Sequence, residues 1–275
     1  MTPRIIVIAR TLAAIALLAL ASCADDKTPG KAAVTTPERP SEIRIGNRCI
    51  AISYDPESAK PRVDSIAITE GGNPVWNLKL TWMPDSMTMT GTHDGQPVLL
   101  AFHLSGANFA TNMIEYAGAS RTAVAETAFY YDSSGFLSNL KTTYYRTSGN
   151  NSASSDRYVK FEVDNNSINH VNDNADIATR ITYSRVDDNA RISVAMTLWD
   201  SEAYQPALYA GVLGRASGKL PTKVETLRDS DKHLLHADTI DSYDYSPEGN
   251  LLRCRIRPLE GSDSAATQVT VKYQH

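Results

Sequence analysis

Six histidines and 31 acidic residues are the side chains of this 275-residue sequence that could carry metal or acid–base chemistry. Only His233 and His236 lie close together among the histidines, and positions three apart on a strand face opposite sides, so they would share a metal only across a turn. The carboxylates of Asp187–Asp188 and Asp229–Asp231 stand among turn residues, where Asp commonly binds the backbone. We therefore expect a surface histidine pair and turn-forming carboxylates, with no metal, no cofactor and no active site.

The sequence also lacks the motifs of a serine nucleophile and of a phosphate-binding loop. The sequence has no Gly-x-Ser-x-Gly elbow, and the segment Gly214–Lys219 is one residue short of a phosphate loop and is followed by Leu220. Glycoside hydrolysis by two carboxylates stays open as the alternative function, because the separation of such a pair depends on tertiary structure.

Three tryptophans, Trp76, Trp82 and Trp199, are candidates for stacking on sugar rings. Trp76 and Trp82 share one face of a predicted strand with two leucines, in a strict alternation of apolar and polar residues. That alternation is typical of core positions, so we expect these tryptophans in the core rather than in a binding site.

The residue with the clearest chemistry is Cys23, because its thiol follows a secretory signal. Arg4 and Arg10 precede an apolar run of about a dozen residues, well short of the roughly 20 that span a bilayer. The run ends in Leu20–Cys23, which resembles the lipobox of bacterial lipoproteins residue for residue. The resemblance implies cleavage before Cys23 and acylation of its thiol, which would anchor the mature chain in a membrane through lipid.

Asp25 and Asp26 follow Cys23 closely and resemble the export tag of surface lipoproteins in certain Gram-negative bacteria. Ala24, in contrast, does not resemble the signal for retention in the inner membrane. We expect a lipid-anchored protein of the outer membrane, and both cell-surface exposure and a periplasmic location stay open. The acidic pair has a second interpretation as part of a solvated tether.

The charge of the chain argues against nucleic acid as a partner. The net charge is −4, and loss of Arg4 and Arg10 with the signal takes the mature chain to about −6, without any basic block. With Cys23 acylated, Cys49 and Cys254 are the remaining cysteines, in a compartment that permits disulfides. Two alternatives stay open for them, namely a disulfide between Cys49 and Cys254 and a buried free thiol at Cys254.

From Ile43 onward the sequence predicts an all-β fold. Apolar and polar residues alternate over Val75–Met83 and again over Val98–Leu104, and Gly, Asn and Asp clusters recur between such segments. The pattern predicts an antiparallel meander of about 12–14 strands that forms a curved sheet or a soluble barrel. Charged residues within the segment from Lys141 to Lys160 argue against a lipid-facing band.

Two stretches interrupt the alternation and predict one or two short helical insertions. Asp200–Pro221 is rich in Ala and Leu, and Ser105–Ala123 contains small residues. The predicted domain organisation is a signal peptide at residues 1–22, a lipidated flexible tether at 23–41 and a single β-meander domain at 42–275.

A family resemblance rests on several motifs together. Two hairpins, Phe129–Leu137 and Tyr243–Leu252, are variants of one tyrosine-aspartate unit, and Tyr209–Pro221 contains Gly-x-x-Ser-x-x-Leu-Pro. With the lipobox and tether, they resemble an uncharacterised family of bacterial lipoproteins that has a porin-like β fold. The resemblance implies a fold and a cellular location but no activity. We therefore expect a non-catalytic scaffold that binds a glycan or a protein, or that supports an envelope assembly.

Overall fold

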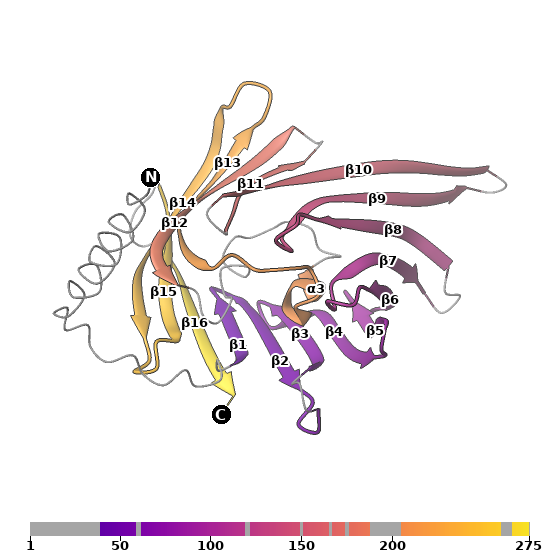
Figure 1. Cartoon of the computed structure of the whole chain (residues 1–275), viewed down its shortest axis with the longest axis horizontal. Coiled ribbons are helices and arrows are strands. Elements are labelled where there is room, and N and C mark those ends of the chain that lie inside the picture. Colours follow the sequence, from indigo (N-terminus) through magenta and orange to yellow (C-terminus); the bar gives the residue numbers. More distant parts are fainter. Residues whose placement is uncertain are drawn as a thin grey trace, which may run out of the picture. The chain divides into compact units, whose positions relative to one another are not determined.

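Sixteen β-strands form the barrel of this protein in a computed structural model that describes residues 39–58, 62–118, 122–148, 151–164, 167–173, 176–187, 205–259 and 266–274. Each strand pairs antiparallel with its neighbours in the chain, and the sheet closes on itself (Figure 1). The strands are β1 (Arg39–Ile45), β2 (Arg48–Tyr54), β3 (Val63–Glu70), β4 (Asn73–Trp82), β5 (Ser86–His93), β6 (Gln96–Leu104), β7 (Ala110–Ala117), β8 (Thr122–Tyr131), β9 (Leu137–Ser148), β10 (Asn151–Asp164), β11 (Ser167–Asp173), β12 (Ile177–Asp187), β13 (Lys219–Arg228), β14 (Leu234–Tyr245), β15 (Leu251–Pro258) and β16 (Thr267–Gln274).

The barrel closes where the first strand meets the last. β1 pairs with β16 in a register that sets Ile43 opposite Val271, and both side chains are buried. On the other face of the same two strands Glu42 lies opposite Lys272, and their side chains form an ion pair at 2.9 Å. Apolar packing inside and an ion pair outside therefore hold the two ends of the folded chain together.

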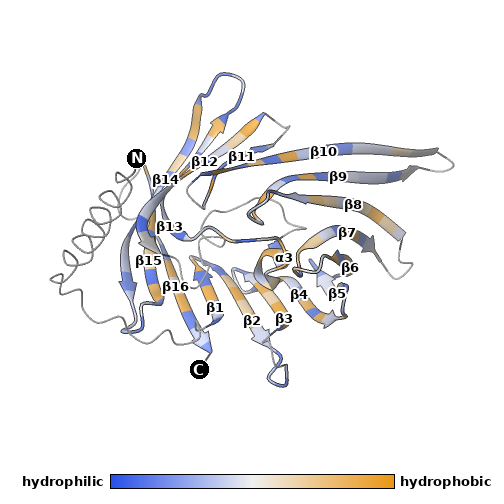
Figure 2. Cartoon of the chain, viewed as in Figure 1, coloured by the Kyte–Doolittle hydropathy of each residue, from blue (hydrophilic) through white to orange (hydrophobic). Residues whose placement is uncertain are grey.

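The inner face of the barrel is apolar. Ile50, Ile66, Leu78 and Leu100 are each 1% exposed or less and belong to one cluster of buried side chains. They come from β2, β3, β4 and β6, whose burial alternates along each strand, and bands of alternating hydropathy are visible in Figure 2. Burial of this face supplies the main stabilisation of the fold.

The outer face carries paired charges. Lys79 and Asp64 lie 2.5 Å apart, and Lys141 and Asp156 lie 2.9 Å apart, on strands whose alternate residues are buried inside. A lipid-facing barrel instead needs an apolar band on its outside, where each Lys or Arg at the membrane midplane costs about 2–4 kcal/mol. These two ion pairs place charged groups on the outer face of β3–β4 and β9–β10.

Residues 205–218, which precede β13, pack inside the barrel. They contain the helix α3 (Gln205–Ala210), which packs against β3 (Figure 1). The side chains of Ala207, Val212 and Leu213 join the core cluster. We call residues 205–218 the plug segment. No helix in the described ranges is long and apolar enough to cross a membrane.

Hydrogen bonds tie the plug segment to strands near both ends of the barrel. Arg48, which follows the β1–β2 turn, donates to the Gln205 side chain. The amide of Arg215 donates to the carbonyl of Gly135 at 2.8 Å, in the β8–β9 turn. Successive turns of a meander lie at alternate ends, so these two contacts are at opposite ends of the barrel. The plug segment is therefore an integral part of the core.

Three five-residue turns at one end of the barrel have the same pattern of backbone hydrogen bonds. They are Ser105–Phe109, Asp132–Phe136 and Ser246–Asn250, and in each the first amide donates to the fifth carbonyl while the fourth amide donates to the first carbonyl. The fourth residue, Asn108, Gly135 or Gly249, has a positive φ of 61–88°. The two hairpins identified as variants of one unit do share a turn, and the third copy uses Asn in place of Gly.

This third turn explains why the second predicted helix is wrong. Residues 105–123 contain the turn, strand β7 and the start of β8 rather than a helix. Asn108 adopts the left-handed conformation that reverses the chain, and pairing of β7 with β6 and β8 then determines an extended backbone. The first predicted helix is confirmed as α3.

The all-β class and the barrel are confirmed, but the structure has 16 strands where the sequence predicts about 12–14. Polar strands such as β11 show little apolar alternation, and pairing on both sides defines them. The fold also begins at Arg39, so residues 39–41 belong to β1 rather than to the tether. The signal peptide and most of the tether lie outside the described residues.

Gly91 provides a test of the inner packing. Its φ of 159° is extended, but a Cβ at this position would lie 1.8 Å from the carbonyl oxygen of Asn77 on β4. We expect Gly91→Ala to force the two strands apart and to lower the free energy of unfolding by about 1–3 kcal/mol. Thermal unfolding should show a melting temperature lower by about 2–4 °C for each kcal/mol.

Gly106→Ala is the matched control, because a Cβ at Gly106 meets nothing within 4 Å and the residue does not have a positive φ. It should unfold at the native temperature. Equal melting temperatures for both variants would contradict the close approach of β4 and β5.

The pairing of β1 with β16, which we call the closing seam, predicts that the stability of the fold depends on pH through Glu42. The hydrogen bond from Arg44, followed by that from Lys272, lowers the pKa of Glu42 from 4.5 to about 2. Because the pKa of Glu42 is lower in the folded state than in the unfolded state, the ionised carboxylate stabilises the fold at pH values above about 4.5. This stabilisation is lost as the pH falls from about 4.5 through about 2. Glu42→Gln should therefore destabilise the protein at pH 7 by at most about 1 kcal/mol, because the partners are half-exposed.

Denaturant titrations at pH 7 and near pH 2 measure this difference, and the two proteins should be equally stable at the lower pH. A difference that persists unchanged near pH 2 would mean that the carboxylate charge at the seam is not responsible.

Candidate functional site

A pocket of about 500 Å³ lies on the outer face of β8–β11. Its volume is within the range of about 300–1,000 Å³ that is common for small-molecule sites. We call it the tyrosine pocket. It is lined by Tyr130, Asn139, Leu140, Lys141, Tyr158, Val159, Lys160 and Asn172.

Strand alternation places its two tyrosines on the outside. Phe129 and Val159 are buried in the core, so their neighbours Tyr130 and Tyr158 point to the opposite face, where they are 52% and 50% exposed. Large aromatic side chains left this exposed on a folded surface often mark contact sites. The alternation that identifies both residues is present in the sequence, but sequence reasoning considered only tryptophans as stacking residues.

The strand register sets the arrangement of the pocket. Tyr130 lies opposite Asn139, and Tyr158 lies opposite Lys141, so β9 separates the two tyrosines. Two strand spacings correspond to roughly 10 Å. The Lys141 ammonium lies 5.4 Å from the centre of the Tyr158 ring, a cation–π distance that orients the ring. The pocket thus offers two aromatic faces across a polar floor.

Charges beside the pocket are paired. The hydrogen bond from Lys141, followed by that from Thr143, lowers the pKa of Asp156, and the bond to Asp156 in turn raises the pKa of Lys141. Both groups are therefore charged at neutral pH and neutralise each other, and Asp156 is not part of the lining. The lining itself offers aromatic rings, two carboxamides and ammonium groups.

A second pocket, of about 480 Å³, lies between β10, β11, β12 and β13. Asp164 is the one carboxylate among the residues that line it, and the tyrosine pocket has none. Glycoside hydrolysis needs two carboxyl groups about 5–10 Å apart, so neither pocket has that arrangement. The part of the chain that the structure describes also contains no group of three or more residues able to hold a metal ion.

The tryptophans lie in or near the core. Trp76 is 1% exposed and stacks on His93 with ring centres 3.8 Å apart. Trp82 is half-buried and donates its ring N–H to the carbonyl of Val63 at 2.7 Å. The core interpretation is confirmed for Trp76, and Trp199 lies outside the described residues.

The histidine and aspartate candidates are surface and turn residues. His233 and His236 are both exposed, and Nε2 of His236 lies 3.0 Å from a carboxylate oxygen of Asp238. Asp231 accepts the backbone N–H of His233, which confirms its turn role. Asp229 accepts bonds from Lys232 and Asn172, Asp187 ends β12, and Asp188 lies outside the described residues.

Neither Cys49 nor Cys254 forms a disulfide in this structure. Cys49 on β2 and Cys254 on β15 are separated by β1 and β16, a distance of roughly 14 Å across the sheet. A disulfide needs Cα atoms within about 7 Å. Cys254 is 1% exposed, and burial, followed by the nearby charge of Asp241, raises the pKa of its thiol to about 12. Cys254 is buried, as the second alternative predicts.

The N-terminal candidates, Cys23 for lipidation and Asp25 and Asp26 for export, lie outside the described residues. Lipidation and export stay predictions from the sequence.

Comparison with protein-family models finds no match, and comparison with curated proteins finds none either. Solved structures do match. A porin-like protein from Bacteroides uniformis ATCC 8492 superposes with a TM-score of 0.61 at 12% identity, covering 87% of this chain and 98% of that protein. A porin-like protein from Bacteroides vulgatus ATCC 8482 gives a TM-score of 0.56 at 9% identity, covering 86% and 99%. At such identities the likeness concerns the fold alone, and it confirms the porin-like β fold.

Proposed function

We propose that this protein is a lipid-anchored, non-catalytic envelope protein whose barrel presents a glycan-binding site at the tyrosine pocket. The observation that carries the proposal is the pair of half-exposed rings, Tyr130 and Tyr158, set across a polar floor on a rigid sheet. Sugar rings present C–H groups on their faces and hydroxyls at their edges, and such a surface accepts both.

The lining favours a glycan over a protein ligand. Asn139 and Asn172 offer carboxamide oxygens that accept hydrogen bonds, while the amide of Asn172 donates to Asp229. The ammonium groups of Lys141 and Lys160 are paired with Asp156 and Glu162 and keep further N–H donors. The two aliphatic residues of the lining, Leu140 and Val159, are buried on the core side. A protein interface would be expected to expose an apolar centre, which this pocket lacks.

The non-catalytic part of the proposal is supported by the lack of paired carboxylates in either pocket. The anchoring part is supported by the lipobox at Cys23, and the location part by the paired charges on the outer face of the barrel. A water-facing barrel held on the outer membrane by lipid accounts for all three. The acidic net charge continues to argue against nucleic acid.

Alanine substitution of the two tyrosines tests the pocket. In affinity electrophoresis against soluble xylan, mannan and galactan, the native protein should be retarded by at least one polymer. Tyr130→Ala and Tyr158→Ala should each weaken that retardation by roughly two- to tenfold, since an aromatic contact contributes about 0.5–1.5 kcal/mol. The double variant should lose it almost completely.

Tyr145→Ala is the control, because Tyr145 is also an exposed tyrosine, 39% exposed, but does not line the pocket. It should bind like the native protein. Equal binding by the native protein and the double variant would exclude the tyrosine pocket as the glycan site. Failure of every polymer would favour a protein ligand.

The anchor is tested by localisation in a Gram-negative host that exports lipoproteins. Cys23→Ser should move the protein from the membrane fraction to the soluble fraction, because the acceptor thiol for lipid is gone. Protease added to intact cells should degrade the native domain and spare an Asp25→Ala, Asp26→Ala variant.

Protection of both proteins in intact cells, with degradation after lysis, would place the domain in the periplasm. A Cys23→Ser protein that stays with the membrane would contradict lipid anchoring.

A further inference from the structure

The second pocket occupies an opening in the barrel wall. β11 and β12 pair only between His170–Asp173 and Ile177–Arg180, although both strands continue beyond these residues. On one side β11 stays paired with β10 as far as Ser167, and on the other β12 stays paired with β13. Residues 167–169 of β11 and the part of β12 after Arg180 are therefore not paired with each other, and the pocket of about 480 Å³ lies at this separation.

The opening is braced at its inner edge by the plug segment. The hydroxyl of Tyr183 on β12 donates to the carbonyl of Ile168 on β11 at 2.6 Å and lies 2.8 Å from Oγ of Ser217. Ser217 also accepts the amide of Ile168 at 3.1 Å. These bonds hold the separated strands at a defined distance, so the opening is a constructed feature of the fold.

Two buried polar atoms in this pocket have no hydrogen-bond partner. They are Oγ of Ser167, whose side chain is only 2% exposed, and the carboxamide oxygen of Asn169. Buried polar atoms are almost always paired in folded proteins, and leaving one unpaired costs about 1–3 kcal/mol. A ligand that accepts from Ser167 and donates to Asn169 would satisfy both atoms.

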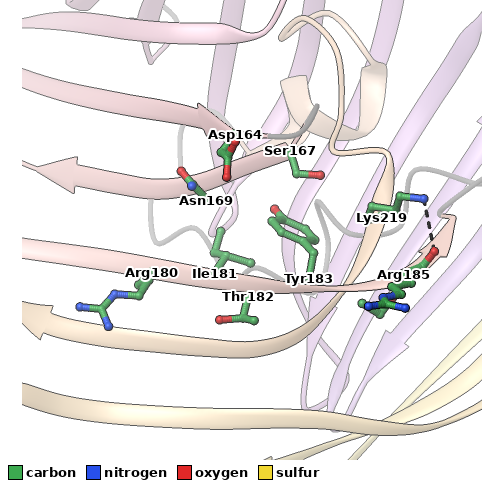
Figure 3. A pocket seen from close by; sticks show the side chains of 10 residues that line it. Asp164, Ser167, Asn169, Arg180, Ile181, Thr182, Tyr183, Arg185 and Lys219 are labelled. Atoms are coloured by element: carbon green, nitrogen blue, oxygen red, sulfur yellow. Dashed lines mark hydrogen bonds between the residues drawn. The ribbon is translucent and has the colours of Figure 1, made fainter.

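Positive charge predominates around these atoms. Arg180, Arg185 and Lys219 line the pocket with one carboxylate, Asp164. Figure 3 shows the Ser167 hydroxyl, the Tyr183 ring and the Lys219 side chain at one end of the pocket, with Arg185 beside Lys219. Arg180 lies within 3.7 Å of Glu225, and the Lys219 ammonium donates to the backbone carbonyl of Arg185 at 3.3 Å, the dashed line in Figure 3. Guanidinium and ammonium groups are the usual partners of oxyanions.

We propose that this opening binds a small sugar acid, with its oxyanion held by Arg185, Lys219 and the Ser167 hydroxyl and a sugar hydroxyl donating to Asn169. A bare inorganic anion fits less well, because it has few protons to offer to the Asn169 oxygen and fills little of the volume. The inference does not depend on the tyrosine pocket, since the two pockets have no lining residue in common.

Calorimetric titration of the detergent-solubilised full chain with D-glucuronate tests this inference, with glucose and inorganic phosphate as comparison ligands. Glucuronate should bind at least about tenfold more tightly than either, because only it supplies both an oxyanion and hydroxyls. Arg185→Ala should weaken glucuronate binding by about tenfold or more, as expected for a hydrogen bond between charged groups. The Tyr130→Ala, Tyr158→Ala double variant should bind glucuronate like the native protein.

Ser167→Ala separates a binding role from a structural one. Removal of an unpaired buried hydroxyl should leave the melting temperature unchanged or raise it, while glucuronate binding falls by about five- to tenfold. Arg146→Ala is the control for charge, because Arg146 is exposed on β9 and lines neither pocket.

Three results would each overturn the proposal. The first is that the native protein does not bind glucuronate. The second is that glucose or phosphate binds as tightly as glucuronate. The third is that Arg185→Ala and Ser167→Ala both retain native affinity. If Arg185→Ala loses glucuronate binding but is retarded by a neutral polysaccharide like the native protein, the two ligands bind at separate sites.

Discussion

The structure depends on keeping the apolar inner face of a large closed sheet away from water. Barrels of 16–18 strands in porins enclose an aqueous channel, which requires a polar interior. Here the inner face is instead lined by buried Ile, Leu and Met side chains. Such an inner face needs apolar partners, and the plug segment supplies some of them through α3 and the residues that follow it. The porin-like fold is therefore combined with an apolar core to which the plug segment contributes.

Filling the barrel from within frees its outer face for water and for ligands. Because the strands are buried on one side only, every second residue is available outside, and the outer rows carry ion pairs and tyrosines. The closing seam of β1 and β16 uses the same division, with Ile43 and Val271 inside and Glu42 and Lys272 outside. The tyrosine pocket follows the same pattern, because Tyr130 and Tyr158 are outward-facing residues on strands whose alternate residues are buried in the core.

The opening between β11 and β12 shows a second consequence of the plug. Where two strands separate, their edge groups lose partners, and the wall would be weak without another support. Tyr183 and Ser217 provide that support through hydrogen bonds to Ile168. Ser167 and Asn169, close by, keep buried polar atoms unpaired. The braced wall and these unpaired atoms are the geometric basis of the sugar-acid site that we propose.

The sequence alone determined the all-β class, the inward position of Trp76 and the turn positions, because these follow from local alternation and from residues that accept a positive φ. It also carried the lipobox at Cys23, a linear motif. Tertiary structure decided the strand count, since polar strands such as β11 exist through pairing, and the turn at Asn108, where a helix was expected. It likewise decided that Cys49 and Cys254 lie too far apart to pair. Both pockets combine residues from three or more strands, and their composition depends on a register that sequence spacing does not contain.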